Sequence, residues 1–342
     1  MTYILLVVGM VMLLFGAGSL VDATVAIAQR TRIALFITAV VIVGLSSTEL
    51  YLSFSTAVMG KGDMSVGNVL GSNLCNNMLV LGIVSMICTF SIRHRGIRRD
   101  IPFSFFATLT VMLLCMDSVF ACSDSNEISR GDGAVFLLVF AAYAAYVLFA
   151  ERRARGRGKA LHDTHIYKCE NDVGAGMYSD APATFFTGKP MKVLVPSAII
   201  GLVILLVGGD MMLDAAVTIA YEWGVSEKVI SITVMSIGKT LPEIATCSIA
   251  AAKRVPEVAL ANVFGENIYN MLFILGLSAT VCPIEVRDVS LSDFGMLLFA
   301  AALTFFFAFV TGRRRFGCLE GTVLIAAYVL YIAHLFIQQG HV

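Results

Sequence analysis

Charged residues are scarce in this chain. Only 14% of its 342 residues are Asp, Glu, Lys or Arg, whereas soluble domains carry about 25%. Hydrophobic residues make up 58% of the chain, and the mean hydropathy is +0.85, so most of the chain is not expected to face water. The 24 basic and 24 acidic residues give a net charge of zero. The chain therefore lacks the excess of positive charge that would predict binding to nucleic acid.

Recognisable cysteine and nucleotide-binding motifs are also lacking. The eight cysteines show no CxxC and no paired spacing, and most lie in apolar runs, where cysteine behaves as a small hydrophobic residue. We therefore expect neither a disulfide framework nor a zinc site. No phosphate-binding loop is present, so ATP is not expected to drive the protein. No nucleophile is paired with a base, so we expect no enzyme activity and no cofactor.

Long apolar runs occur instead along the whole chain. Many reach the length of about 20 residues that a helix needs to span a bilayer. The first run has no charged region and no cleavage signal, which favours a spanning helix over a signal peptide. We expect ten spans, near residues 3–27, 33–60, 66–89, 101–118, 132–150, 192–217, 227–252, 257–281, 293–311 and 319–338.

Basic residues are concentrated in alternate connections between these spans. The segment "RHRGIRR" follows the third span, "ERRARGRGK" the fifth, and "RRR" the ninth. The connections after the first and seventh spans are also basic, with Arg30 and Arg32 in one and Lys253 and Arg254 in the other. The remaining connections are acidic or mixed. Because basic loops stay on the cytoplasmic side, the sequence predicts a multi-pass protein of the cell (inner) membrane. Both termini are expected outside, and the long polar loop 151–190 is expected in the cytoplasm.

The two halves of the chain repeat at an offset of 194 residues. Seven of the seventeen positions in 66–82 are identical to their counterparts. A shared apolar composition would match Leu, Val and Ala, but not Gly, Asn and Glu. The matched pairs include Gly44 and Gly238, Glu49 and Glu243, Asn68 and Asn262, Gly71 and Gly265, Asn73 and Asn267, and Asn76 and Asn270.

The repeat predicts the architecture. Each half carries five spans, an odd number, so the second half enters the membrane from the opposite side. Inverted repeats are typical of transporters, with the substrate site near the midplane where the halves meet. We assign 1–150 to the first repeat, with its motif at 44–82. The cytoplasmic loop is 151–190, and 191–342 is the second repeat, with its motif at 238–276. The expected fold is an all-α polytopic membrane protein of ten transmembrane helices, with helices broken at the midplane.

The repeated segments place carboxylates inside predicted spans. Burying Glu49 or Glu243 in a membrane costs roughly 2.5–3.5 kcal/mol on insertion scales, so each is expected to face a partner. Pro242 disfavours helix in the residue before it, and a break there frees carbonyl oxygens beside a cavity. Carboxylates, amides, hydroxyls and carbonyls are the ligands of a hard cation such as Ca²⁺, which takes about 6–8 oxygens.

Structural alternatives stay open for several polar residues. Asn and Ser in membrane helices also bridge neighbouring helices without binding any ligand. Asp22 and Asp214 align between the first and sixth spans. They could cap helices, pair with basic loop residues or line an ion path, and we slightly favour a structural role.

The repeated motifs resemble the α-repeats of the cation/calcium antiporter superfamily, in particular its sodium/calcium exchanger branch. The family pattern is roughly G-T-S-x-P-E followed by G-N-x-x-G-S-N-x-x-(N/D). The first half matches at Gly44, Ser46, Glu49, Gly67, Asn68, Gly71, Ser72, Asn73 and Asn76. The second half matches at Gly238, Thr240, Pro242, Glu243, Asn262, Gly265, Asn267 and Asn270.

The resemblance implies which residues bind cations. Glu49 and Glu243 are the implied central ligands, with Asn76 and Asn270 beside them. The implied flanking sodium sites include Ser46, Ser72 and Thr240, and the neighbouring motif residues Asn73 and Asn267 complete the candidate set.

The second half departs from the family pattern at Lys239, Ala261 and Glu266, and two of these residues are charged. Lys239 stands where the family has a threonine of a sodium site, and Glu266 stands where it has a serine. We expect the Lys239 ammonium to act as a tethered positive charge with Glu266 as its partner, because an unpaired charge in lipid is costly. Lys239 could alternatively extend to a membrane interface. Leu45 also removes a hydroxyl from the related position in the first half.

The leading hypothesis is a secondary active antiporter that exchanges Ca²⁺, or a similar divalent cation, against Na⁺ or H⁺ by alternating access. Its expected partners are inorganic cations and the lipid bilayer. A cation channel is the alternative, as is an exchanger whose ion coupling is altered by Lys239 and Glu266. A membrane-embedded enzyme fits less well, because no acid pair or nucleophile is present.

Overall fold

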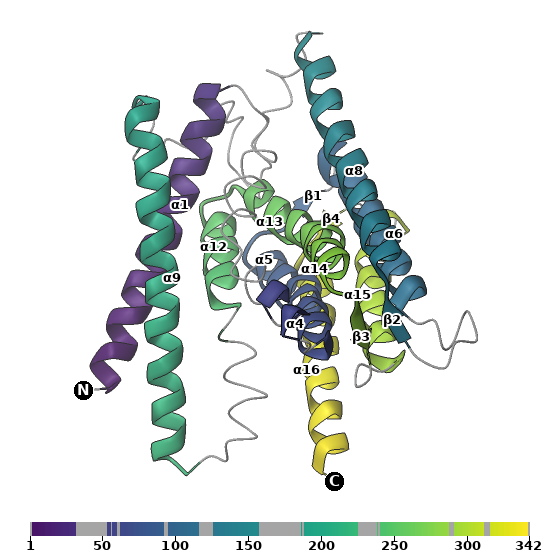
Figure 1. Cartoon of the computed structure of the whole chain (residues 1–342). Helices are drawn as coiled ribbons and strands as arrows, with labels where there is room; N and C mark the ends of the chain where they lie inside the picture. Colours follow the sequence, from purple (N-terminus) through teal and green to yellow (C-terminus); the bar gives the residue numbers. More distant parts are fainter. Residues whose placement is uncertain are drawn as a thin grey trace.

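The chain folds into long helices accompanied by short strands (Figure 1). The computed structural model describes residues 2–31, 53–55, 57–59, 62–91, 95–115, 126–156, 186, 188–224, 238, 240–286, 291–310 and 315–340. The helices are α1 (Thr2–Thr31), α4 (Gly62–Cys75), η1 (Asn76–Val80), α5 (Leu81–Ile87), α6 (Arg95–Cys115), α8 (Arg130–Gly156), α9 (Met191–Glu222), α12 (Leu241–Ala252), α13 (Pro256–Ile268), η4 (Tyr269–Ile274), α14 (Leu275–Val281), α15 (Leu291–Phe309) and α16 (Cys318–Gly340). The strands are β1 (Phe90–Ser91), β2 (Asn126–Ile128), β3 (Ile284–Val286) and β4 (Arg315–Phe316).

Seven helices in the described part of the chain are long and apolar enough to cross a membrane. They cover Thr2–Ala28, Met64–Ile87, Arg130–Ala150, Met191–Glu222, Pro256–Val281, Leu291–Phe309 and Cys318–Leu335, and each coincides with a predicted span. Of the other predicted spans, 101–118 falls on α6 and 227–252 is represented by the shorter α12. The span 33–60 lies largely outside the described residues. These helices confirm the prediction of an all-α polytopic membrane protein.

The same succession of elements occurs twice. In the first half, α4, η1, α5 and β1 follow one another, and in the second half α13, η4, α14 and β3 do so. The π-helical turns η1 and η4 begin at Asn76 and Tyr269. Each therefore contains one of the two matched asparagines, Asn76 in η1 and Asn270 in η4. Wide π-turns inside helices are frequent at functional sites, and the sequence analysis did not predict them.

The short strands join one half of the chain to the other. Strand β1, after α5, pairs antiparallel with β4, which precedes α16, and Phe90 aligns with Phe316. Strand β3, after α14, pairs in the same way with β2, which precedes α8. The rings of Phe90 and Phe316 also stack, with centroids 5.6 Å apart. Each half is therefore held to the other at the ends of its equivalent helices.

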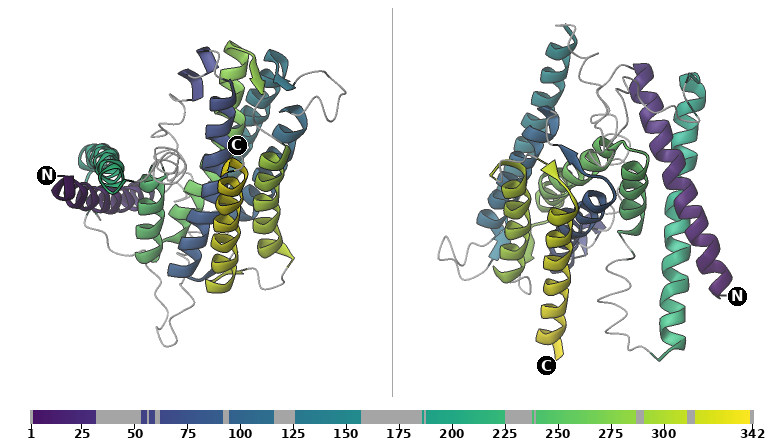
Figure 2. Two further views of the ribbon diagram at one scale, coloured as in Figure 1. Left: turned by 90° about the horizontal axis from the view of Figure 1, so that it is seen from below. Right: turned by 180° about the vertical axis from the view of Figure 1, so that it is seen from behind.

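Helices α1 and α9 form a pair at one side of the molecule, and α12 lies between them and the other helices (Figures 1 and 2). Glycines allow the two helices to approach closely. A Cβ atom on Gly208 would lie 2.6 Å from the backbone nitrogen of Leu13, and one on Gly16 would collide with the backbone of Leu205. Any side chain at Gly16 or Gly208 would force the two helices apart.

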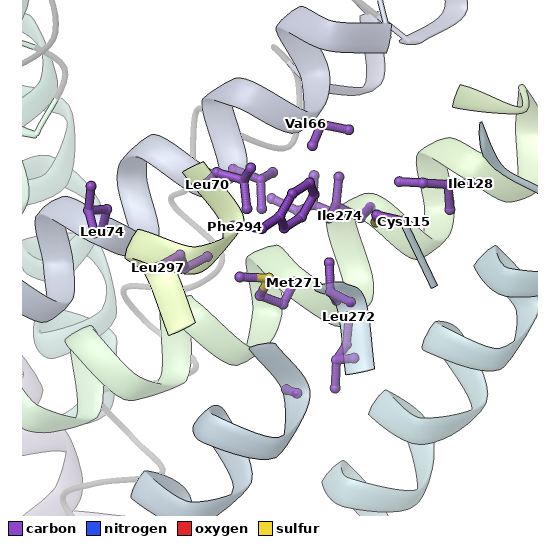
Figure 3. Packing of buried hydrophobic residues seen from close by; sticks show 14 of the residues in the cluster. Val66, Leu70, Leu74, Cys115, Ile128, Met271, Leu272, Ile274, Phe294 and Leu297 are labelled. Carbon is purple, nitrogen blue, oxygen red and sulfur yellow. The ribbon is translucent and has the colours of Figure 1, made fainter. Parts of the chain in front are cut away.

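The core of the larger group of helices is apolar and draws on both halves. Val66, Leu70 and Leu74 of α4 face the same cluster as Met271 of η4 and Phe294 of α15 (Figure 3). Helices α4 and η4 carry repeated asparagines, and close apolar packing holds these two helices against each other independently of their polar contacts.

One sequence-based expectation about cysteines is wrong. Cys88, at the end of α5, takes part in a disulfide, whereas no disulfide framework was expected. A disulfide requires two Cα atoms about 4.4–6.8 Å apart in space, and the spacing of cysteines along the chain does not give that distance.

Candidate functional site

Helix α12 begins at the place where the sequence predicts a break in the seventh span. Residue 240 forms a turn, α12 begins at Leu241, and Pro242 lies in its first turn. Proline is well tolerated there, because the first amides of a helix have no partner within the helix. The break places Glu243 in the first turn of α12, where the helix dipole favours a carboxylate.

Four asparagines from the two halves lie where α4 and η1 of the first half pack against α13 and η4 of the second. The Nδ2 atom of Asn73 donates to the backbone oxygen of Asn267 over 3.4 Å. The Nδ2 atom of Asn270 donates to Oδ1 of Asn73 over 3.3 Å. All of these side chains, with Asn76, are at most 2% exposed. The structure therefore brings together four of the predicted site residues in one buried polar cluster.

Two further contacts connect this cluster to the positions that follow the repeated glycines. Asn76 donates its Nδ2 to Glu266 Oε2 over 3.2 Å. Asn270 donates its Nδ2 to Ser72 Oγ over 3.4 Å. Ser72 and Glu266 are each less than 9% exposed. Both predicted residues therefore lie inside the cluster, and each one accepts from the other half of the chain.

Several buried acceptor oxygens of the predicted site residues have no hydrogen-bond partner among the described residues. They are Oδ1 of Asn76, Oδ1 of Asn270, Oδ1 of Asn267 and Oε2 of Glu243. Buried polar atoms in native proteins are nearly always satisfied, because an unsatisfied acceptor costs about 1–3 kcal/mol. A bound hard cation would satisfy carboxylate and amide oxygens together.

Thr240 contacts a residue that the sequence analysis did not select. The Sγ atom of Cys75 lies 3.3 Å from Oγ1 of Thr240, and both side chains are buried. Cys75 directly precedes Asn76 and aligns with Tyr269, so neither the repeat nor the spacing of cysteines singled it out. The contact ties the end of α4 to the start of α12.

Glu49, Ser46 and Lys239 lie outside the described residues. The predicted pairing of Lys239 with Glu266 therefore stays a prediction. The first-half carboxylate and hydroxyl are likewise known only from their places in the repeat.

Two other repeated asparagines bridge neighbouring helices. Asn68 donates to Ser53 Oγ over 3.2 Å, and Asn262 approaches Cys247 Sγ at 3.3 Å. Ser53 and Cys247 are also 194 positions apart, so the same contact is made in each half. For Asn68 and Asn262, the contacts favour the structural alternative, in which an asparagine bridges neighbouring helices without binding a ligand.

Asp22 and Asp214 differ in their surroundings. Asp22 of α1 accepts from Lys253 over 2.6 Å, and Lys253 also donates to the backbone oxygen of Gly18 over 3.2 Å. Lys253 follows α12 directly, so α1 is joined to the end of α12 by a partly buried ion pair. Asp214 is exposed on α9. The contact of Asp22 agrees with the structural role that was favoured for it.

Comparison with known proteins identifies the family. The family model for sodium/calcium exchanger proteins matches residues 1–149 and 194–337. CaxA of Alkalimonas amylolytica is 29% identical over 337 residues, which cover 97% of this chain and 98% of that protein. The sodium/calcium exchanger MaX1 of Methanosarcina acetivorans is 24% identical over 356 residues, which cover 98% of each chain.

The fold matches solved structures over the same length. A structure of the sodium-calcium exchanger NCX_Mj aligns with a TM-score of 0.73 and 23% identity, over 98% of both chains. The family match extends over most of the chain. The apolar spanning helices and the polar cluster between the repeated helices are consistent with that match. The chain belongs to the sodium/calcium exchanger family, within the cation/calcium antiporter superfamily.

Proposed function

We propose that the protein is a secondary active antiporter that exchanges Ca²⁺, or a similar divalent cation, against Na⁺ or H⁺ by alternating access. The observation that carries this proposal is the set of buried, unpaired oxygens on Asn76, Asn270 and Glu243. They come from both halves of the chain, and their chemistry suits a hard cation better than a transition metal.

The proposed ligands divide into a centre and its flanks. Glu49 and Glu243 are the central carboxylates, with Asn76 and Asn270 beside them. The hydroxyls of Ser46, Ser72 and Thr240 are proposed for the flanking sites, and Asn73 and Asn267 complete the set. Two carboxylates balance the charge of one divalent ion, which is the reason for placing Ca²⁺ at the centre.

The proposed architecture is ten transmembrane helices in two inverted five-helix repeats. Its support is the repeated order of α4, η1, α5 and β1 in α13, η4, α14 and β3. The alternation of basic connections supports an outside location for both termini and a cytoplasmic location for 151–190. Under this arrangement the polar cluster lies where the two repeats meet, as in other inverted-repeat transporters.

We propose that α1 and α9 move as one unit against the other helices. The glycines Gly16 and Gly208 hold α1 and α9 in close backbone contact. Among the described residues, the contacts of this pair to other helices run chiefly through α12. Because Gly16 and Gly208 face the partner helix of the pair, the sliding contact is proposed at α12.

Two alternatives keep specific support. A cation channel would also use buried oxygens, but channels usually build a pore around an axis, whereas this cluster lies between the halves of one chain. An exchanger of altered coupling is favoured by Lys239 and Glu266, which replace residues of a family sodium site.

The test is uptake of radioactive calcium by proteoliposomes that contain the purified protein, with imposed gradients of Na⁺, K⁺ or H⁺. The proposal expects saturable uptake that requires an opposing gradient of Na⁺ or H⁺. Uptake driven by voltage alone, without a counter-ion, would identify a channel. Comparing Na⁺ with H⁺ gradients determines which coupling ion is used.

A further inference from the structure

The two contacts that cross between the halves at Asn76 and Asn270 are equivalent, but their acceptors differ. Asn76 donates to a carboxylate, Glu266 Oε2, over 3.2 Å. Asn270 donates to a hydroxyl, Ser72 Oγ, over 3.4 Å. The offset of 194 residues relates Asn76 to Asn270 and also Ser72 to Glu266. The two donors, Asn76 and Asn270, are therefore equivalent in the repeat, and so are the two acceptors, Ser72 and Glu266.

These contacts engage the nitrogen end of each side-chain amide and not its carbonyl end. A side-chain amide offers N–H donors at one end and a carbonyl acceptor at the other. Only the carbonyl end can bind a cation, since the nitrogen end presents hydrogens. In both asparagines Nδ2 is engaged across the interface, while Oδ1 is buried and has no partner in the described part of the chain.

We propose that Glu266 and Ser72 are positioning residues that hold the amide nitrogens of Asn76 and Asn270, so that both carbonyl oxygens face the transported cation. The inference rests on the proposed function for the identity of that cation. It gives Glu266 a role in addition to its predicted partnership with Lys239. A hydrogen bond to a carboxylate is about twice as strong as one between neutral groups. Asn76 is held by one such bond, whereas Asn270 donates both to Ser72 and to Asn73 Oδ1.

A swap of side chains tests the contact while it keeps the net charge. Asn76→Asp replaces the donor by a second carboxylate and sets two negative charges against each other. Glu266→Gln removes a charge and keeps the shape. The double variant Asn76→Asp, Glu266→Gln restores one donor and one acceptor with their places exchanged. All of these substitutions are nearly isosteric, so the folded protein is expected to persist.

The inference predicts that Asn76→Asp raises the calcium KM about tenfold or more, because a charge-assisted hydrogen bond is replaced by repulsion. The maximal rate is expected to fall less than the KM rises. The double variant is expected to return to within about threefold of the wild-type KM, since one hydrogen bond is restored. A double variant as poor as the product of the single effects would overturn the inference.

The matched control is Asn270→Asp combined with Glu266→Gln. It has the same net charge as the swap, but the Glu266 side chain does not accept from Asn270. The control is expected to stay impaired. Equal rescue by the control would show that total charge alone matters, and would also overturn the inference.

Failure of the proposed function gives a different result. Wild-type protein that takes up no calcium under any gradient would contradict the antiporter proposal. The thermal unfolding midpoints of the four proteins would then test the contact itself, with Asn76→Asp expected to lower the midpoint and the swap expected to restore it. Midpoints without this rescue would overturn the inference as well.

Discussion

Asn76 and Asn270 each donate their side-chain amide to the opposite half of the chain. They lie in the equivalent π-helical turns η1 and η4, and each is at most 1% exposed. The orientation of each of these proposed ligands thus depends on the packing of the other half. A motion that separated the two motif helices would release both amides at once.

Two asparagines in the same helical segment are predicted to respond differently to the same substitution. Asn68→Ala removes a contact to Ser53 and is expected to lower stability by about 0.6 kcal/mol, the average for hydrogen bonds between membrane helices. Its calcium KM is expected to stay unchanged. Asn76→Ala removes a proposed ligand and is expected to raise the calcium KM about tenfold or more.

Unfolding midpoints and calcium KM values of both purified variants check this prediction. A rise in KM for Asn68→Ala as large as for Asn76→Ala would contradict the division into bridging and ligand asparagines.

Restraining α1 against α12 is predicted to stop transport. Asp22 and Lys253 lie in contact, with 2.6 Å between Oδ1 and Nζ, so cysteines at these two positions are within reach of a short bifunctional thiol reagent. If α1 and α9 slide against α12, cross-linking should abolish calcium uptake, and reductive release of the link should restore it.

The control for this experiment links α1 to α9. A Cβ atom on Gly201 would lie 3.2 Å from Cβ of Ser19, near the separation of about 3.5–4.5 Å found in disulfides. Ser19→Cys with Gly201→Cys should therefore join two helices that move together, and uptake should persist. Unchanged uptake after linking α1 to α12 would contradict the sliding motion.

Lys239 and Glu266 are predicted to be energetically coupled. Each single change, Lys239→Thr or Glu266→Ser, leaves one charge without its predicted partner, which costs about 3–5 kcal/mol in buried pairs. The double change should be less harmful than either single change and should tolerate or gain sodium coupling. Ser72, which accepts from Asn270 in the other half, indicates that serine at position 266 can still hold Asn76.

A double-mutant cycle on thermal stability and on sodium-driven calcium flux measures this coupling. Single effects that simply add would show that the two residues do not interact, and Lys239 would then need another explanation.

Much of this molecule could be predicted from its sequence because the bilayer imposes strict rules. Apolar length placed seven helices to within a few residues, and Pro242 indicated the start of α12. The offset of the repeat aligned Asn76 with Asn270 and Ser72 with Glu266. Combining these two alignments would have indicated that the partners could meet across the halves.

Other features depend on tertiary packing and left no local signal. The π-helical turns η1 and η4 begin at Asn76 and one residue before Asn270, and no distinctive spacing of apolar residues marks them. The pairing of β1 with β4 joins residues more than 200 positions apart. The disulfide at Cys88 and the contact of Cys75 with Thr240 likewise depend on distances that a sequence does not contain.

The central claim is that carboxylates of the two repeats bind the transported cation. Glu243 presents a buried oxygen, Oε2, without a partner in the described residues, and Glu49 is its counterpart in the first half. Glu243→Gln and Glu49→Gln keep the shape of the side chain and remove its charge. Both variants should remain folded in the membrane, because an uncharged amide is easier to bury than a carboxylate.

The most direct test is gradient-driven uptake of radioactive calcium by proteoliposomes that hold equal amounts of wild-type, Glu243→Gln or Glu49→Gln protein. The account predicts uptake by the wild type under an opposing Na⁺ or H⁺ gradient, and none above empty liposomes for either variant. Near-normal uptake by either folded variant would contradict it.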